Sequence, residues 1–157
     1  MCRRALTDSG LPPERLELEI TESVLLQDNA ENIEMLHQLR DLGISIVLDD
    51  FGTGYSSLSY LRMFPFNKIK IDRSFIRELS RNSDCASIIS AVAGLGRSLQ
   101  IATVAEGLES EEQLVLVRAA GCTHAQGFLF GRPCAAEELK FGRVLSRKGR
   151  MHRTANN

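Results

Sequence analysis

The chain has 157 residues and a formal net charge of −1, with 43% hydrophobic and 25% charged side chains. This length fits one domain with a modest core. The near-zero charge gives no overall field that favours a DNA or RNA polymer or a membrane surface, so we expect none of these as partners. The apolar runs are too short to span a bilayer. Four scattered cysteines without a CxxC pair favour reduced thiols in a cytoplasmic protein.

The predicted elements alternate along the chain between short apolar strands and segments with helical spacing of apolar residues. In chain order, each predicted strand leads to a predicted helix: 16–20 to 31–42, 44–48 to 56–63, 68–71 to 84–99, 101–105 to 110–119, and 122–128 to 135–145. The last strand and the last helix have the weakest patterns. Ser110 is predicted to cap its helix. No hairpin signal separates two strands.

Five consecutive β–α units with short connections predict an α/β fold with about five parallel strands and covering helices. Two strands depart from the fully apolar pattern of a buried parallel sheet. Glu17 and Glu19 share one face of the first strand, and Lys68 and Lys70 share one face of the third. In a barrel, such a face points at the axis. We expect the domain to cover 1–146 and residues 147–157 to form a disordered, polar, basic tail.

Acidic, amide or lysine side chains lie near or just after the C-terminal end of every predicted strand. They are Glu19 and Glu22, Asp49 and Asp50, Lys70 and Asp72, Glu106 and Glu109, and Gln126. The C-terminal ends of parallel strands share one edge of the fold, which is where α/β proteins form their sites. We therefore expect these side chains to converge on one site.

Converging carboxylates repel strongly unless positive charge compensates them. One lysine does not neutralise Glu19, Asp49, Asp50 and Glu106, whereas divalent cations do. Hard oxygen ligands favour Mg²⁺ or Mn²⁺. Neighbouring carboxylates also suit a pair of ions, which would activate a water and stabilise the transition state of phosphodiester hydrolysis. Lys70 would then orient that water or neutralise charge developing on the phosphate.

Structural explanations compete with this interpretation at several positions. A single acid at a strand end is often a helix cap or a solvated loop residue, and Glu22 and Glu109 stay open between supporting the site and simple capping. Glu17 is interpreted as a partner that faces solvent or a helix, Lys68 as a surface charge, and His124 as structural because its spacing is not that of a metal ligand. Coincidence across four strand ends argues against a purely structural account of the acids.

Five motifs in order carry a family resemblance. They are EITE at 19–22, DDFGTGYSS at 49–57, KID at 70–72, EGLE at 106–109 and QGFLFGRP at 126–133. Together they closely resemble the EAL domain of bacterial cyclic di-GMP phosphodiesterases, a group of second-messenger signal-transduction proteins. The resemblance covers about residues 11–141, and the second motif is highly specific.

The resemblance implies an incomplete TIM-like (β/α)₈ barrel and hydrolysis of cyclic di-GMP to the linear dinucleotide pGpG with Mg²⁺ or Mn²⁺. It implies that Glu19 and Asp49 ligate one ion, and that Asp49 bridges to a second ion held by Asp50 and Glu106. It gives catalytic roles to Lys70 and Glu106. Supporting or substrate-lining roles fall to the remaining motif residues Glu22, Asp72, Glu109 and Gln126.

The Glu-Ala-Leu signature of the family is absent from these residues. In the family it lies upstream of the LELEITE stretch, with a strand-borne Asn and further metal ligands. We therefore expect exposed sheet edges that drive self-association, and little phosphodiesterase activity from this chain alone. Two functions stay open: the C-terminal part of a phosphodiesterase, or a non-catalytic module of degenerate EAL type that binds cyclic di-GMP or another protein.

Overall fold

The computed structural model describes residues 2–22, 30–54, 61 and 63–138, with the side chains of 30 and 31 left out. Of the predicted helix over 56–63, the structure therefore describes only residues 61 and 63. Most of the predicted helix over 135–145, and the predicted tail over 147–157, lie outside them. Of that last helix, the described part contains a short 3₁₀ turn, Ala136–Glu138.

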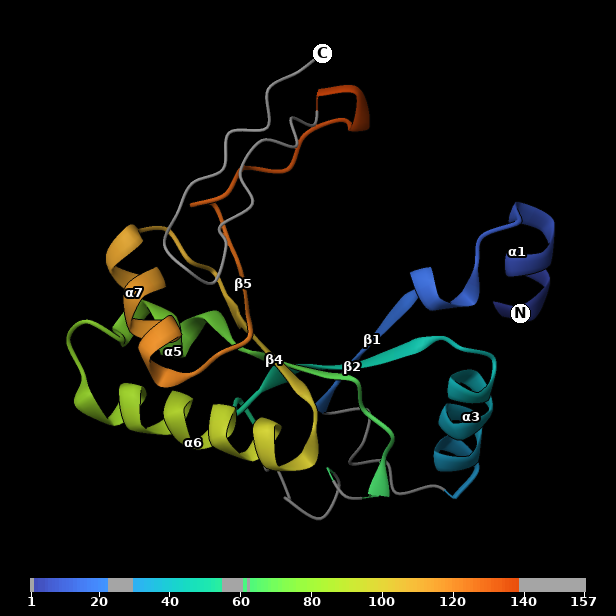
Figure 1. Ribbon diagram of the computed structural model, residues 1–157, viewed down its shortest axis with the longest axis horizontal. Coiled ribbons are helices and arrows are strands. Elements are labelled where there is room, and N and C mark those ends of the chain that lie inside the picture. Colours follow the sequence, from blue (N-terminus) through green and yellow to red (C-terminus); the bar gives the residue numbers. More distant parts are fainter. Residues whose placement is uncertain (1, 23–29, 55–60, 62, 139–157) are drawn as a thin grey trace.

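Five parallel strands form one sheet whose spatial order follows the order of the chain (Figure 1). The strands are β1 (Glu17–Thr21), β2 (Ser45–Phe51), β3 (Lys68–Ile71), β4 (Ala102–Glu106) and β5 (His124–Gln126). The prediction of five parallel strands with covering helices is confirmed. Only β3 has the predicted bounds. Strands β1 and β4 each lie one residue later than predicted, β2 runs on through both aspartates, and β5 is shorter.

Five α-helices accompany the sheet in the part of the chain that the structure describes (Figure 1). They are α1 (Cys2–Ser9), α3 (Ala30–Asp41), α5 (Arg73–Glu78), α6 (Ser83–Leu99) and α7 (Glu111–Ala120). Helix α7 begins as predicted at Ser110, whose hydroxyl accepts the Gln113 amide while the Gln113 side chain accepts the Ser110 amide. Helix α6 ends at Gln100, which takes the left-handed conformation common after a helix. None of the described helices has both the length and the apolar character that crossing a bilayer requires.

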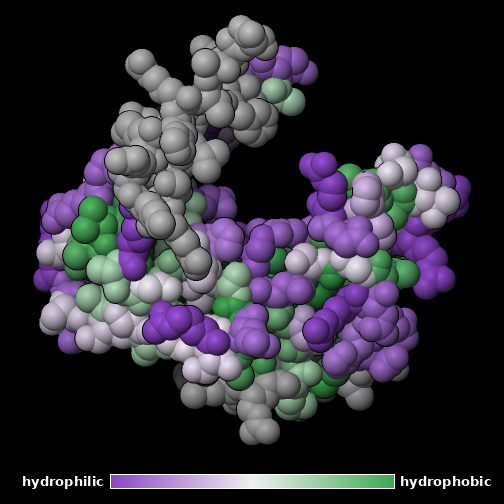
Figure 2. Space-filling model, in the orientation of Figure 1, coloured by the Kyte–Doolittle hydropathy of each residue, from purple (hydrophilic) through white to green (hydrophobic). Residues whose placement is uncertain are grey.

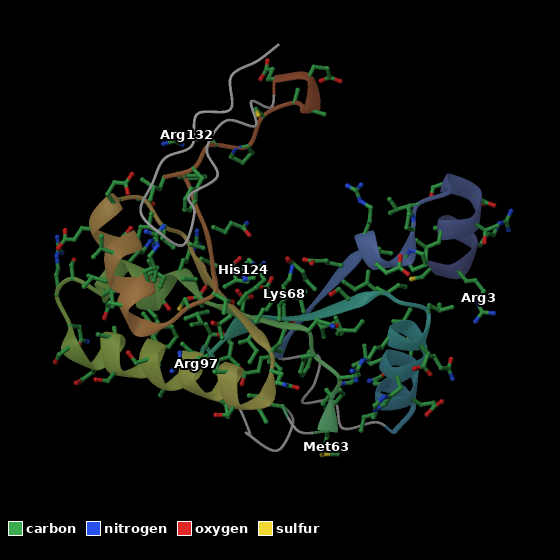
Figure 3. All side chains as sticks on the ribbon, in the orientation of Figure 1. Arg3, Met63, Lys68, Arg97, His124 and Arg132 are labelled. Atoms are coloured by element: carbon green, nitrogen blue, oxygen red, sulfur yellow. The ribbon has the colours of Figure 1, made fainter. Side chains whose placement is uncertain are left out.

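The two faces of the sheet have different chemistry. Leu48, Ile69 and Thr103 lie side by side in register and are fully buried beneath the helices. The opposite face carries Glu19, Val47 and Lys68 in register. A space-filling view shows a broad hollow with a largely hydrophilic floor, and Lys68 and His124 lie at that floor (Figures 2 and 3). The helices therefore cover one face, and the hollow opens on the other.

Helix α5 was not predicted from the sequence. It has six residues, too few for a periodic apolar pattern to show, and only Ile76 is fully buried in it. The local signal is its cap: the Asp72 carboxylate accepts the backbone amide of Ser74 at 2.9 Å. Because Asp72 directly follows β3, this helix begins at the strand ends where the polar side chains gather.

Candidate metal centre

A bulge in β2 explains how two adjacent aspartates reach the same site. Leu48 pairs with Ile69 and Phe51 pairs with Ile71, so Asp49 and Asp50 together lie opposite the single residue Lys70. Successive strand residues normally point to opposite faces. Asp50 avoids this because it has a φ of 54°, in the left-handed region. Both carboxylates therefore lie on the same side of the sheet.

Carboxylate oxygens of Asp49, Asp50 and Glu106 lie within 4.8 Å of one another. Glu106 ends β4, so the cluster joins two strands that are separated by β3. All three side chains are half-buried. Three hard oxygen donors at this spacing fit a divalent cation such as Mg²⁺ or Mn²⁺. The described residues thus bring together three of the four predicted metal ligands.

The fourth predicted ligand, Glu19, reaches the cluster through Lys70. The buried Lys70 ammonium donates to Glu19 Oε2 at 2.9 Å and lies 3.2 Å from Asp49 Oδ1 and 2.8 Å from Glu106 Oε1. Burial by itself would lower the pKa of Lys70. Hydrogen bonds to Glu106, Glu19 and Asp49 outweigh burial and raise the pKa above its ordinary value. Lys70 is therefore a fixed positive charge at the centre of the acids.

For the pKa of Glu106, burial outweighs the hydrogen bond, the reverse of the case for Lys70. Burial raises its pKa, the hydrogen bond and charge of Lys70 lower it, and the nearby charges of Asp49 and Glu19 raise it again. The net effect is a raised pKa. A cation beside Glu106 would favour its ionised form, so the chemistry of this carboxyl is suited to binding metal.

A second ion pair lies below the first on the same face. Lys68 pairs with Glu17, as Lys70 pairs with Glu19. Both pairs cross β2, which separates β1 from β3. Glu17 is exposed and Lys68 is half-buried, and neither belongs to the acidic cluster of the described residues, which fits the interpretation of Lys68 as a surface charge. The ion pair itself was not predicted. The alternation of LELEI and KIKI contained a signal for it, because it placed each pair of like residues on one face.

Glu22 lies beneath the loop that follows β2. It is 5% exposed, and neither carboxylate oxygen has a hydrogen-bond partner among the residues that the structure describes. A Cβ built at Gly54 would lie 3.4 Å from the Glu22 carboxylate, an ordinary van der Waals contact, so the loop passes close to this side chain. This placement fits the expected role of Glu22 as a support for the loop. An unpaired buried carboxylate is costly, which sets Glu22 apart from an ordinary capping residue.

The remaining predicted site residues line a cavity of about 400 Å³ next to the acids, together with Asp50 and Glu106. Asp72 lines it while also capping α5. Gln126 lies in register with Glu106 at the end of β5. Glu109 lines the cavity too, and its helix is capped by Ser110 instead. The strand-end argument therefore placed these residues around one cavity, as expected.

Five residues that line this cavity were not among the predicted site residues: Arg73 and Arg77 of α5, Gly107, Gly127 and Phe128. Arg73 directly follows the predicted site residue Asp72, and Arg77 lies one helical turn after Arg73. That spacing was the available signal, because it places both arginines on one side of a helix. Phe128 is 50% exposed, and the Arg132 guanidinium lies 4.6 Å from the centre of its ring.

His124 and the cysteines take no part in the acidic cluster. The hydroxyl of Thr123 lies 2.9 Å from His124 Nδ1, and His124 belongs to no group of potential metal ligands among the described residues. Cys2, Cys85, Cys122 and Cys134 are all free. Burial raises the pKa of the Cys122 thiol, which keeps it protonated and unreactive.

The fold and the acidic cluster define a class of protein: an α/β barrel-like domain with a group of carboxylates at its strand ends that could hold a metal ion. The family model of the EAL domain matches residues 1–133. The chain belongs to the EAL domain family.

Similar proteins agree with this assignment. The chain is 49% identical over 137 residues to the bifunctional diguanylate cyclase/cyclic di-GMP phosphodiesterase MucR of Pseudomonas aeruginosa, covering 87% of this chain and 20% of MucR. The structure of the PaMucR phosphodiesterase in complex with c-di-GMP matches with a TM-score of 0.82 and 48% identity, over 87% of this chain and 55% of that one. A manganese and c-di-GMP complex of Klebsiella pneumoniae BlrP1 matches with a TM-score of 0.80 and 34% identity, over 85% and 34%.

The chain spans only 16–20% of the length of the first curated relatives that it matches. The matched region lies within the EAL domain, whose solved relatives are TIM-barrel-like. The prediction of a partial barrel of this family is confirmed.

Proposed function

We propose that this site takes part in the hydrolysis of cyclic di-GMP to pGpG. The observation that carries the proposal is the cluster of Asp49, Asp50 and Glu106 with the Lys70 ammonium among the acids. Relatives named as cyclic di-GMP phosphodiesterases support the choice of substrate. The same relatives support a bacterial signalling role, and the four free cysteines support a cytoplasmic location.

Two ions are proposed for the complete site. Glu19 and Asp49 would hold the first, Asp49 would bridge, and Asp50 and Glu106 would hold the second. When bound, such ions supply an activated water and stabilise charge on the phosphate. Lys70 would hold the water or the phosphate oxygen in line, because its ammonium is fixed by three carboxylates and keeps its proton. Asp50, in its left-handed conformation, would hold its carboxylate ready without rearrangement.

These residues alone are proposed to turn over substrate slowly. The inner face of the sheet opens on a broad hollow (Figure 2). Water in that hollow weakens the electrostatic interactions on which phosphoryl chemistry depends. A non-catalytic binding module is the second candidate, and one observation favours it: the Lys70 ammonium pairs with Glu19, Asp49 and Glu106 and so offsets part of their charge from within the chain.

The test is release of pGpG from cyclic di-GMP by the purified chain with Mn²⁺, followed by chromatography. We expect slow release that stops on chelation. Glu106→Gln should abolish it, because the amide keeps the shape of the side chain and loses the ligand charge. Glu111→Gln on the exposed start of α7 is the matched control and should leave the rate unchanged.

The outcomes separate the candidates. Binding of cyclic di-GMP without any pGpG would favour the binding module. Release that survives chelation, or that Glu106→Gln leaves intact, would contradict the metal-dependent mechanism.

A further inference from the structure

Two arginines line the same cavity as the acids Asp50 and Glu106. Arg73 and Arg77 lie one helical turn apart on α5, so their side chains leave the helix on one side. Both are exposed, and neither guanidinium makes an ion pair or hydrogen bond with another described residue. Arg132 differs, because its guanidinium packs over the ring of Phe128. The cavity therefore contains two guanidinium groups whose donors are available to a ligand.

A close backbone approach fixes where this pair lies relative to the metal centre. Gly107 directly follows Glu106 and has a φ of 74°. A Cβ built at Gly107 would lie 2.6 Å from the Cβ of Arg73, so a larger residue would collide with the start of α5. The absence of a side chain at Gly107 lets Arg73 pack directly against the end of β4. The spacing between the arginines and Glu106 is thus set by packed secondary structure.

The charges of the cavity are divided. Four acids line it, Asp50, Asp72, Glu106 and Glu109, against the two arginines. A nucleotide carries its charge on phosphate, which these acids would repel. A metal ion at Asp49, Asp50 and Glu106 would remove the repulsion for one phosphate only. A ligand with two phosphates needs a second positive site, and guanidinium groups match phosphate oxygens in pairs.

We propose that Arg73 and Arg77 bind the phosphate of the dinucleotide that is not being cleaved. The identity of the ligand rests on the function proposed above, whereas the site itself rests on the arginines. A cavity of about 400 Å³ falls in the lower part of the usual range for ligand sites, about 300–1,000 Å³. Its size therefore suits one nucleotide unit beside the metal centre better than a whole cyclic dinucleotide. Arg73 and Arg77 would select a dinucleotide over a mononucleotide.

Calorimetric titration of the purified chain tests this, with cyclic di-GMP, pGpG, GMP and inorganic phosphate as separate probes. Arg73→Ala and Arg77→Ala should each weaken the binding of both dinucleotides about tenfold, the usual loss for a hydrogen bond to a charged group. GMP, which has one phosphate to place, should lose less. Arg77→Lys should recover part of the affinity, because it restores the charge and not the paired geometry.

Arg81→Ala is the matched control. Arg81 lies just beyond α5, is exposed and does not line the cavity, so its removal makes the same change in net charge. Equal affinities in Arg77→Ala and Arg81→Ala would overturn the inference. The inference would also be overturned if both variants lost affinity for the dinucleotides and high salt abolished the two losses equally, because the loss would then be a general effect of charge.

Failure of this inference can be told from failure of the proposed function. If the chain releases pGpG and the arginine variants bind and react like Arg81→Ala, only the phosphate site is wrong. If the chain releases no pGpG and the dinucleotides still depend on Arg73 and Arg77, only the proposed reaction is wrong, and the phosphate site is supported.

Discussion

At the scale of single residues, the backbone conformation of Asp50 is linked to its place in the acidic cluster. Asp50 adopts a left-handed conformation that non-glycine residues seldom take. This unfavourable conformation occurs at the bulge opposite Lys70, where it lets two adjacent acids face the same side of the sheet. The strained conformation therefore lies within the acidic cluster and not in the turn that follows it.

Lys70→Met should destabilise the metal-free chain and increase its response to divalent cations. The ammonium and a cation compete for the same oxygens of Asp49 and Glu106. Removing a buried partner leaves these acids uncompensated, which we expect to lower the free energy of unfolding by about 2 kcal/mol because Glu19 is partly solvated. Thermal unfolding with and without Mn²⁺ measures both effects.

Lys68→Met serves as the control for that measurement. Lys68 pairs with Glu17 and not with the clustered acids. We expect it to leave the Mn²⁺ response as it is in the unmodified chain. An identical Mn²⁺ shift in Lys70→Met and Lys68→Met would argue against competition at the cluster.

At the scale of elements, helix α5 shows how one residue joins a strand to a site. Asp72 is the single residue between β3 and α5; it caps α5 and lines the cavity. The helix that it begins carries Arg73 and Arg77. Helix α7 is tied to α5 as well, because the Gln113 side chain donates to the carbonyl of Ile76 at 3.2 Å. The helices beside the cavity are thus held by polar contacts as well as by apolar packing.

Asp72→Ala should lower the free energy of unfolding by about 1 kcal/mol at neutral pH, the usual value of a helix cap. Burial would raise the pKa of Asp72, but hydrogen bonds from the Ser74 hydroxyl and amide outweigh burial and lower it. A carboxyl with a depressed pKa in the folded state stabilises the fold above its unfolded pKa. The contribution is lost as pH falls through the lower, folded value.

Urea unfolding at neutral and strongly acidic pH measures this contribution. The difference between the unmodified chain and Asp72→Ala should shrink in acid. Asp72→Asn keeps a capping oxygen and should lie between them at neutral pH, with no acid-dependent loss of its own. A gap that stays constant down to low pH would show that the carboxylate charge has no part in the cap.

At the scale of the whole molecule, the sheet has two free edges among the described residues. The strands β1 and β5 end the sheet, and no described strand pairs with their outer sides. Unpaired strand edges favour association with another chain. Phe130 adds an apolar side chain, 52% exposed, at a cavity lined also by His124 and Ala125 of β5. The β5 edge therefore combines unpaired backbone with an apolar surface.

We expect the purified chain to self-associate through these edges, with a sedimentation coefficient that rises with concentration. Phe130→Ser should weaken the association. Val115→Ser is the control, since Val115 is an exposed apolar residue on α7, 63% exposed, that does not line this cavity, although its side chain is smaller than that of Phe130. A monomer at every concentration would contradict the prediction, and an equal effect of both variants would place the contact elsewhere.

The order of elements and the identity of the site acids could be read from the sequence. Apolar runs such as IVL and KIKI are local signals, and parallel pairing follows from the absence of hairpins between them. Because parallel strands share an edge at their carboxyl ends, the acids after four strands had to meet. Family motifs then agreed with a site that the strand ends already indicated.

Other features depended on contacts between segments distant in the chain. The pairing of Lys68 with Glu17 spans a whole intervening strand, and the approach of Arg73 to Gly107 depends on how α5 packs against β4. The bulge at Asp49 and Asp50 is defined only against β3. Local sequence determined which residues end the strands, because propensity and periodicity act over a few residues. Tertiary packing decided which charges neutralise one another and which stay available to a ligand, because electrostatic energy depends on distance in space.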